Sequence, residues 1–473
     1  MKKADKKIKI SCIGGNATDV SGSMTLIEFG DTKILIEAGI YQSGNIKNDY
    51  LINSRNFSFK PSEIDYIIIG HIHADHTLLL PRLYAMGCKA PIIAPKDSAR
   101  ILNHMMLDGA KINTRDAHHL SKMYNKQYKP LYDENDVDNT ISHIEEFPFN
   151  EEIQINKHIK IEFIPSGHII QSAQISLTIN FANCIKKILY TSDLGNIAFP
   201  KYYTLPFKAS RKQYDIVFGE STYGNQKSKL TKKHRKNDLN TLKYAIDTTI
   251  ANNGKVIIPV FSLDRAQNMV TYIYELYKNN PEFQAKVYVD SPLACKITNE
   301  YAKILSGEQY EIYEELMNWE NLKFIDSYHV HQSLLESNEP MVVLAAPGFA
   351  NLGRSQNYIE KCVSSSQNSI IFCGYAPENS VAGKLKQKNS TITLNKIRYK
   401  IKAAIFTLET FSSHMQKAEL LEYYSSLKCN TLVLLHGSKE AKESLAYDLI
   451  PLLENKNKST KVVAADKNRQ FYI

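Results

Sequence analysis

His71-Ile72-His73-Ala74-Asp75-His76 is the most diagnostic run in this chain of 473 residues. Four metal-binding side chains fall within six residues, directly after an apolar run, Tyr66–Gly70, that predicts a buried strand. A helix is expected from Leu78 to Met86, so the run lies on a loop between a strand and a helix. His71 and His73 lie on the same side of an extended segment and can share one ion. Imidazole and carboxylate donors favour zinc, with manganese and iron as alternatives.

The number of donors in this run indicates more than one metal ion. A tetrahedral catalytic zinc ion needs only three protein ligands plus water, so four donors in one loop favour two ions. Asp75 and His76 are placed to turn toward the second ion. The alternative interpretation is a solvated polar loop, which three histidines and an aspartate at this spacing disfavour.

Length and composition indicate a globular protein of two domains. The chain is too long for one compact core, and its 43% hydrophobic and 23% charged residues are ordinary values. No apolar run approaches the roughly 20 residues of a membrane span, and the polar start argues against a secretory signal. Seven scattered cysteines without a Cys-x-x-Cys pair favour a reducing cytosol and argue against both a disulfide framework and a cysteine zinc site. The net charge of +9 permits a polyanionic partner without demonstrating one.

The periodicity of the chain changes twice and predicts two architectures. Residues 1–214 contain short strands, including a hairpin of Met24–Phe29 and Lys33–Glu37 across Gly30-Asp31, and a helical stretch near 97–144. Between about residues 215 and 395, apolar strand patterns alternate with helical ones. This alternation predicts a parallel sheet with helices on both faces. From about Thr391 the chain returns to a strand, helix, strand, helix pattern that runs to Ile473.

Three further donors follow apolar runs far downstream. His168, Asp193 and His436 each come just after a predicted strand. Taken singly, such a residue is more commonly a cap or turn residue. Residues at the same end of adjacent strands meet in space, so the shared placement predicts one site assembled from distant segments.

These motifs, in this order, resemble the metallo-β-lactamase superfamily. Glu220-Ser-Thr-Tyr-Gly224, His414 within Phe411-Ser-Ser-His, and His436-Gly437 resemble its β-CASP group of nucleases. The resemblance covers almost the whole chain, and it is nearest to bacterial and archaeal RNA-processing members related to the eukaryotic pre-mRNA 3′-end cleavage subunit. It implies an α/β fold: an αββα sandwich of residues 1–214 and 396–473, with an α/β β-CASP domain inserted at residues 215–395. The insert would close over the metals as a lid.

The resemblance also implies a site with two Zn²⁺ ions, with Mn²⁺ as the alternative. One ion would be held by His71, His73, His168 and Asp193, and the other by Asp75, His76, Asp193 and His436. Asp193 would bridge the ions, and Asp75 would count among the catalytic residues. Two cations lower the pKa of water and stabilise the charge of the phosphate in its transition state.

Other residues are assigned roles by the same resemblance. His414 would protonate the leaving 3′ oxygen as general acid, held by Glu220, for which a strand-end salt bridge is the alternative. Glu37 stands where the family usually has aspartate and would orient metal ligands. Arg265 and Ser380 would contact substrate phosphates. The basic stretch from Lys227 to Lys236 is either a phosphate track or a solvated helix face.

The implied activity is zinc-dependent hydrolysis of phosphodiester bonds in single-stranded RNA. One alternative is a DNA-directed nuclease, although DNA-processing relatives tend to carry valine where this chain has His436. The others are a small-molecule metallohydrolase, which would have little need of a large lid, and a non-catalytic RNA-binding subunit. In this family, relatives that degrade RNA processively from the 5′ end often carry an extra C-terminal domain. Only about 37 residues follow His436 here, so we expect endonucleolytic cleavage, with exonuclease trimming left open. A homodimer or an RNA-processing complex stays open as well.

Overall fold

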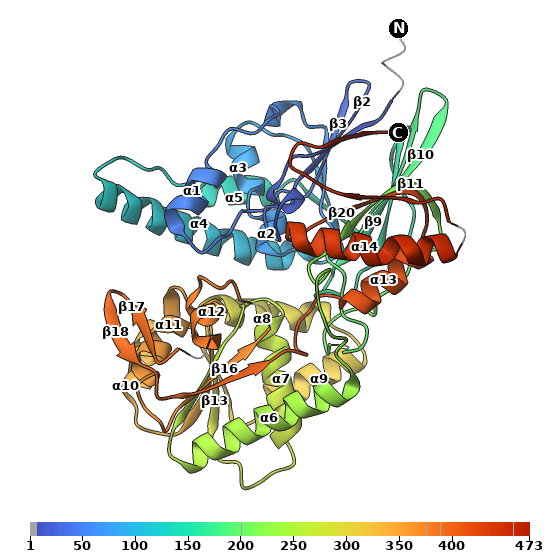
Figure 1. Ribbon diagram of the computed structural model, residues 1–473. Helices are drawn as coiled ribbons and strands as arrows, with labels where there is room; N and C mark the ends of the chain where they lie inside the picture. The colour runs from blue at the N-terminus through green and yellow to red at the C-terminus, as the bar shows by residue number, and fades with distance from the viewer. Residues whose placement is uncertain (1–6, 200, 375, 388, 457) are drawn as a thin grey trace. The chain divides into compact units, whose positions relative to one another are not determined.

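The computed structural model describes residues 7–199, 201–374, 376–387, 389–456 and 458–473, so most of the polar start lies outside the described residues. The chain forms two compact units (Figure 1). Unit 1 comprises Met1–Ile197, Thr204–Lys229 and Ser413–Ile473, and unit 2 comprises Ala198–Tyr203 and Leu230–Ser412. Among the helices of these residues, none combines the length and the apolar character needed to cross a membrane.

Unit 1 is built on two seven-stranded sheets. The first has the order β22-β1-β2-β3-β4-β5-β6, formed by β22 (Gln470–Tyr472), β1 (Lys9–Cys12), β2 (Thr25–Phe29), β3 (Thr32–Ile36), β4 (Tyr66–Ile68), β5 (Ile92–Pro95) and β6 (Ile144–Phe147). The second has the order β21-β20-β11-β10-β9-β8-β7, formed by β21 (Lys461–Ala464), β20 (Lys428–Leu435), β11 (Gln213–Glu220), β10 (Cys184–Tyr190), β9 (Ala173–Phe181), β8 (Ile159–Pro165) and β7 (Ile153–Asn156).

Helices cover the outer faces of these sheets. Those beside the first sheet are α1 (Ile46–Asn53), α2 (Ala74–Thr77), α3 (Leu80–Ala85), α4 (Ser98–Tyr124) and α5 (Glu134–Ile141). Those beside the second sheet are α13 (Lys417–Ser426) and α14 (Lys439–Asn455). Unit 1 is therefore the αββα sandwich that the family resemblance implies.

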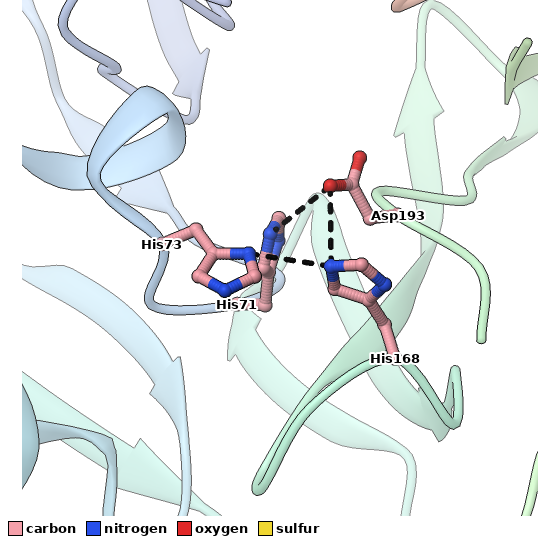
Figure 2. A group of neighbouring side chains, drawn as sticks. All are labelled: His71, His73, His168 and Asp193. Atoms are coloured by element: carbon pink, nitrogen blue, oxygen red, sulfur yellow. Dashed lines mark hydrogen bonds and ion pairs between the residues drawn. The ribbon is translucent and has the colours of Figure 1, made fainter. Parts of the chain in front are cut away.

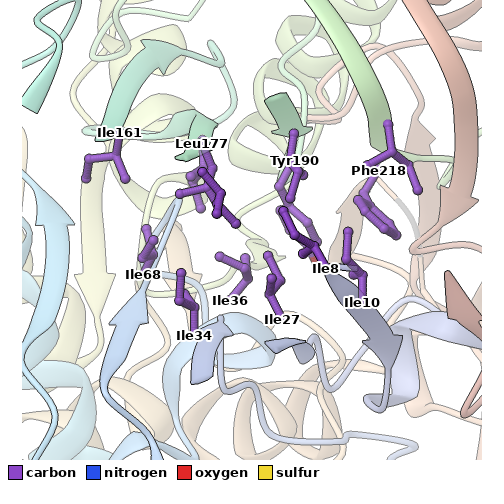
Figure 3. Packing of buried hydrophobic residues seen from close by; sticks show 14 of the residues in the cluster. Ile8, Ile10, Ile27, Ile34, Ile36, Ile68, Ile161, Leu177, Tyr190 and Phe218 are labelled. Atoms are coloured by element: carbon purple, nitrogen blue, oxygen red, sulfur yellow. The ribbon is translucent and has the colours of Figure 1, made fainter. Parts of the chain in front are cut away.

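The core of unit 1 lies between the two sheets (Figure 3). Ile34 and Ile36 of β3 pack there with Leu177 of β9 and Ile161 of β8. Leu35, between the two isoleucines, is equally buried but faces the opposite side of the sheet. Both faces of β3 are covered, which explains why this strand reads as a continuous apolar run.

Unit 2 contains one six-stranded parallel sheet with the order β14-β13-β15-β12-β16-β19. Its strands are β12 (Lys255–Pro259), β13 (Lys286–Asp290), β14 (Leu322–Ile325), β15 (Met341–Ala345), β16 (Ser369–Cys373) and β19 (Ala404–Leu408). Its helices are α6 (Lys232–Ala251), α7 (Arg265–Tyr277), α8 (Pro292–Ile304), α9 (Glu308–Met317), α10 (Tyr328–Glu336), α11 (Gly353–Cys362) and α12 (Val381–Lys386). Two separate apolar clusters, one on each face of the sheet, confirm the predicted arrangement. A hairpin of β17 (Thr391–Leu394) and β18 (Ile397–Lys400) completes the unit.

The boundaries of the insert differ from the expected residues 215 and 395. β11 pairs with β10 and β20 in the sandwich, so the main part of unit 2 begins only at Leu230. β19 pairs with β16, so unit 2 extends to Ser412. Both strands are apolar runs of the same kind as their neighbours along the chain, and only their long-range pairing assigns them to a unit.

The hairpin and the helices predicted within unit 1 agree more closely with the structure. The hairpin of β2 and β3 pairs Phe29 with Thr32 across the predicted turn. The helical stretch near 97–144 is α4 and α5. The helix expected at 78–86 is shorter, because α3 spans Leu80–Ala85 and the separate α2 carries the end of the histidine run.

Candidate metal centre

The topology of unit 1 brings the predicted donors to one edge of the sandwich. β10, β11 and β20 are neighbouring parallel strands, so their carboxyl ends lie at the same edge. Asp193 follows β10, Glu220 ends β11 and His436 follows β20. β8 runs in the same direction as β10, because each is antiparallel to β9, and its end leads to His168. In the first sheet, the histidine run follows β4 and enters α2 at Ala74.

The first group of donors consists of His71, His73, His168 and Asp193 (Figure 2). Asp193 Oδ2 lies 3.4 Å from His71 Nε2 and 3.5 Å from His168 Nε2. His168 Nε2 lies 3.2 Å from His73 Nδ1. His71 and His168 are fully buried, and burial lowers the pKa of His73 well below its ordinary value. A neutral imidazole with a lone pair directed at its neighbours is the form that binds a metal ion.

The second group consists of Asp75, His76, Asp193 and His436. His436 Nε2 lies 3.3 Å from both His76 Nε2 and Asp75 Oδ2. The oxygen that Asp193 presents here is Oδ1, at 3.5 Å from His76 Nε2 and 3.3 Å from His436 Nδ1. The two oxygens of Asp193 therefore face different groups.

The spacing of these atoms fits metal coordination. Bonds of about 2.0–2.2 Å to a tetrahedral zinc ion separate neighbouring ligand atoms by roughly 3.3–3.6 Å. The separations that use one donor atom of each residue, with Nε2 for His436, range from 3.2 to 3.5 Å. His71 Nε2 and Asp193 Oδ1 are buried and have no hydrogen-bond partner among the residues that the structure describes. The donor set therefore fits divalent cations with nitrogen and oxygen ligands.

The electrostatics of the groups also favour bound positive charge. Burial acts to raise the pKa of Asp193, yet the fields of His436 and His76 hold it well below its ordinary value. Burial acts to lower the pKa of His436, but Asp193 and Asp75 raise it to about 9. Carboxylates kept ionised in a buried site attract cations, which is what a metal site requires.

Glu37 supports both groups from behind. Its Oε2 lies 2.5 Å from His76 Nδ1, and its Oε1 accepts a hydrogen bond of 2.5 Å from Ser192 Oγ. Ser192 Oγ in turn lies 2.8 Å from His71 Nδ1. Burial opposes ionisation, but His76 and His71 lower the pKa of Glu37 to about 2. Hydrogen bonds at Nδ1 leave the Nε2 atoms of both rings for a metal ion, as expected for a residue that orients ligands.

His414 and Glu220 form a pair beside the metal groups. His414 Nδ1 lies 3.2 Å from Glu220 Oε1, which also accepts from Leu194 N at 2.9 Å, while Glu220 Oε2 accepts from Thr222 N at 3.0 Å. Glu220 is fully buried, whereas 21% of the His414 side chain is exposed. The His414 ring lies 4.5 Å from the ring of His168.

Comparisons with known proteins agree with this architecture. The Beta-Casp domain family matches residues 266–385, and the family described as Zn-dependent metallo-hydrolase RNA specificity domain matches residues 398–463. The chain belongs to the β-CASP group of the metallo-β-lactamase superfamily. The family of the anti-Pycsar protein Apyc1 matches residues 12–241. The match to a zinc-dependent family and the clustered donors together support the use of a metal by this β-CASP hydrolase.

Individual relatives match over most of their length. Ribonuclease TTHA0252 of Thermus thermophilus is 24% identical, with 90% of this chain and 92% of that protein covered. The transcription termination factor FttA of Methanocaldococcus jannaschii is 26% identical over 92% of this chain and 68% of its own. An RNase J-like protein of the same organism is 28% identical over 82% of this chain and 84% of its own. A crystal structure of a protein of unknown function from Enterococcus faecalis V583 covers 99% of this chain and 100% of its own, with a TM-score of 0.54 and 13% identity, and shows the fold alone.

Two residues expected to contact substrate phosphates do not belong to the donor groups. Arg265 and Ser380 lie in unit 2, whereas the metal groups and the His414–Glu220 pair lie in unit 1. Ser380 caps α12, since its hydroxyl accepts from Gly383 N at 3.0 Å and donates to Pro377 O at 2.6 Å. Arg265 begins α7 and donates to Cys373 O. Their expected contacts with substrate stay predictions.

Several residues that contact the metal-binding histidines were not identified from the sequence. Thr222 Oγ1 lies 3.1 Å from His436 Nδ1, and Ser23 Oγ lies 3.3 Å from His76 Nε2. The backbone carbonyl oxygen of Asn16 accepts a hydrogen bond of 2.7 Å from the backbone N–H of His436. Thr222 lies within the motif Glu220-Ser-Thr-Tyr-Gly224, so its position beside Glu220 was the available signal. Ser23 carries no such signal.

Proposed function

We propose that this chain is a ribonuclease that uses two zinc ions to hydrolyse phosphodiester bonds of single-stranded RNA. The observation that carries the proposal is the pair of donor groups that share Asp193, with each group facing a different oxygen of its carboxylate. Relatives named as ribonucleases and a family described by RNA specificity support RNA as the substrate.

The proposed metal assignment follows the two groups. His71, His73 and His168 would hold one ion with Asp193 Oδ2, and Asp75, His76 and His436 would hold the other with Asp193 Oδ1. The mixture of imidazole and carboxylate favours Zn²⁺, and Mn²⁺ is the alternative. When bound, two such cations would activate a water molecule and stabilise the negative charge that the phosphodiester gains in its transition state.

The proton for the leaving group would come from His414. Glu220 accepts from Nδ1 of this ring and fixes its orientation, which leaves Nε2 to deliver a proton to the 3′ oxygen as the P–O bond breaks. Glu220 is itself held by the backbone N–H groups of Leu194 and Thr222, so its carboxylate cannot turn away. The products would carry a 5′ phosphate and a 3′ hydroxyl.

A cleavage assay on matched substrates tests the proposal. Wild-type protein with added zinc or manganese is incubated with a labelled linear RNA, a circular RNA of the same sequence and the matching single-stranded DNA. We expect cleavage of both RNAs, little cleavage of the DNA, and at least a hundredfold loss for Asp75→Ala and His436→Ala. The exposed histidine in His118→Ala is the matched control and should leave the rate unchanged.

The outcomes separate the alternatives. Equal rates in the wild type and in both donor variants would exclude the metal groups as the site. Preference for DNA would favour a DNA-directed nuclease, and binding without cleavage would favour a non-catalytic RNA-binding subunit. Cleavage of the circular RNA identifies endonucleolytic action, and shortening of linear RNA alone identifies exonucleolytic action. A cytoplasmic location and assembly into a homodimer or a processing complex stay predictions.

A further inference from the structure

Unit 1 carries a groove that is separate from the metal groups. Two hollows of about 620 and 400 Å³ share the residues Ile13, Phe57, Ser58, Phe59 and Asn468 in their walls. They adjoin along the loop of residues 54–60 that follows α1, and together they are called the Phe57 groove below. The proposed function makes no use of this groove.

The loop along the groove interleaves basic and aromatic side chains. Its sequence is Arg55-Asn56-Phe57-Ser58-Phe59-Lys60. Phe57 and Phe59 are partly exposed, and their ring centroids lie 5.3 Å apart with the planes tilted by 31°. Partly exposed rings that line a hollow offer stacking surfaces to flat ligands such as nucleobases.

The loop is held in place by Arg82, which lies beneath it. The Arg82 guanidinium donates to the carbonyl oxygens of Arg55 and Ser54, each at 2.8 Å, and to that of Asn53. It also lies 4.9 Å from the centroid of the Phe57 ring, a cation–π contact. Because Arg82 is 93% buried, this support is part of the folded core. A loop ordered before a ligand arrives loses little entropy on binding.

Charge is unevenly distributed along the groove. In the smaller hollow the ionisable side chains are Arg55, Arg82, Lys467 and Tyr41, with no carboxylate among the described lining residues. In the larger hollow, Lys9 pairs with Glu28 at 2.9 Å, and Lys33 and Lys60 pair with Glu63 at 2.5 and 3.2 Å. The excess of positive charge therefore lies beside the aromatic rings, in the smaller hollow.

We propose that the Phe57 groove is a second, non-catalytic binding site for single-stranded RNA. Bases would stack on Phe57 and Phe59, and phosphates would pair with Arg55 and Lys467, since lysine and arginine at phosphates supply the salt-dependent part of RNA affinity. The choice of RNA as ligand rests on the proposed function. Charge and aromatic surface together fit a single strand better than an apolar peptide.

The groove lies one loop away from the metal groups. Gly22 lines the smaller hollow, and the next residue, Ser23, places its hydroxyl 3.3 Å from His76 Nε2. RNA in the groove would thus be held near the metal centre without presenting a phosphate to it. The groove should lower the KM for long RNA and leave kcat unchanged.

Binding of a defined RNA tests the groove. The probe is a 5′-fluorescein-labelled single-stranded RNA of 20 nucleotides, and its Kd is measured by fluorescence anisotropy at 4 °C with the metal-loaded protein, each sample being checked for intact RNA. We expect Phe57→Ala/Phe59→Ala to weaken binding at least fivefold. Ser58 is exposed between the rings, so Ser58→Glu should weaken binding and Ser58→Lys should tighten it, each about threefold. Tyr447→Ala, at an exposed aromatic residue of α14, is the control and should bind as the wild type does.

Each result decides for or against the groove independently of catalysis. Wild-type affinity in the double variant and in Ser58→Glu would overturn the proposal even if the protein cleaves RNA. Weak binding by the double variant without opposite effects of the two Ser58 variants would also overturn it, because a folding defect would then explain the loss. The expected pattern in a protein that cleaves no RNA would support the groove and reject the proposed activity.

Discussion

Glu37 and His76 are joined by a contact of 2.5 Å between Oε2 and Nδ1 inside the sandwich, behind the metal groups. Two ligands of one tetrahedral ion lie roughly 3.3 Å apart, so this shorter contact is a hydrogen bond and not a shared coordination position. The other oxygen of Glu37 reaches His71 through Ser192. One buried carboxylate thus orients a histidine of each group.

Replacing Glu37 by glutamine should weaken metal binding. Glutamine keeps the length of the side chain but substitutes an N–H₂ donor for one acceptor oxygen and removes the charge that holds His76. Loss of such a supporting contact typically costs about 10–100-fold in metal affinity. Competition with a chromophoric chelator measures the effect, and Glu151→Gln at an exposed site is the control. Wild-type affinity in Glu37→Gln would show that the carboxylate does not orient the ligands.

Metal content should depend on which donor is removed. The two oxygens of Asp193 face different groups, whereas His436 belongs to one group only. We expect about two ions per chain in the wild type, one in His436→Ala and fewer than one in Asp193→Ala. Mass spectrometry of metal content in purified protein checks these ratios. An Asp193→Ala variant that keeps two ions would contradict the bridging position.

His414→Ala should lower turnover without removing metal. His414 is not a member of either donor group, and loss of a general acid typically reduces the rate by about 10²–10⁴-fold. A substrate whose leaving group needs no proton, such as bis(p-nitrophenyl) phosphate, should be hydrolysed with less than a tenfold loss. The comparison of kcat on the two substrates is the measurement. An equal loss on both would assign His414 a role other than protonation of the leaving group.

Unit 2 contains a buried lysine whose charge should make stability depend on pH. The side chain of Lys201 is 6% exposed, its ammonium lies 3.3 Å from Asp264 Oδ2, and burial lowers its pKa to about 8. The unfolded chain then binds more protons than the folded chain between about pH 8 and 10.5, so this group's contribution to stability rises with pH across that window.

The variant Lys201→Met isolates that contribution. Relative to the variant, the wild type should gain roughly 3 kcal/mol of unfolding free energy between pH 7 and 10.5, because a pKa shift of one unit corresponds to about 1.4 kcal/mol. Midpoints of urea unfolding at the two pH values measure the difference, with Lys303→Met at a half-exposed ion pair as control. A difference between Lys201→Met and wild type that is constant with pH would contradict the shift.

The sequence predicted the donors because each follows a strand that is apolar on its own. His168, Asp193 and His436 could be placed at strand ends from local pattern. Parallel pairing of β10, β11 and β20 brings Asp193 and His436 to one edge, and antiparallel pairing of β8 and β10 with β9 brings His168 to the same edge. Pairing itself is a long-range property, so the membership of β11 and β19 could not be read from their residues. The structure also gives Ser380 a helix-capping role that a hydroxyl group alone does not reveal.

Contacts between loops could not be predicted from the sequence either. The contact between Gly39 and the histidine run can be tested by mutation. A Cβ at Gly39 would lie 1.6 Å from Asp75 O and 2.6 Å from His76 N, both backbone atoms of the histidine run. Gly39 N also donates to Ser23 O at 2.9 Å, which limits how far the segment can move away. Gly39→Ala should therefore displace Asp75 and His76 and reduce metal content by about one ion, with at least a hundredfold loss of activity on RNA.

Gly87→Ala is the control, because its Cβ meets no atom within 4 Å although its φ of 90° strains the backbone. Metal content and activity like those of the wild type in Gly39→Ala would show that the turn carrying Asp75 can shift without loss of the site.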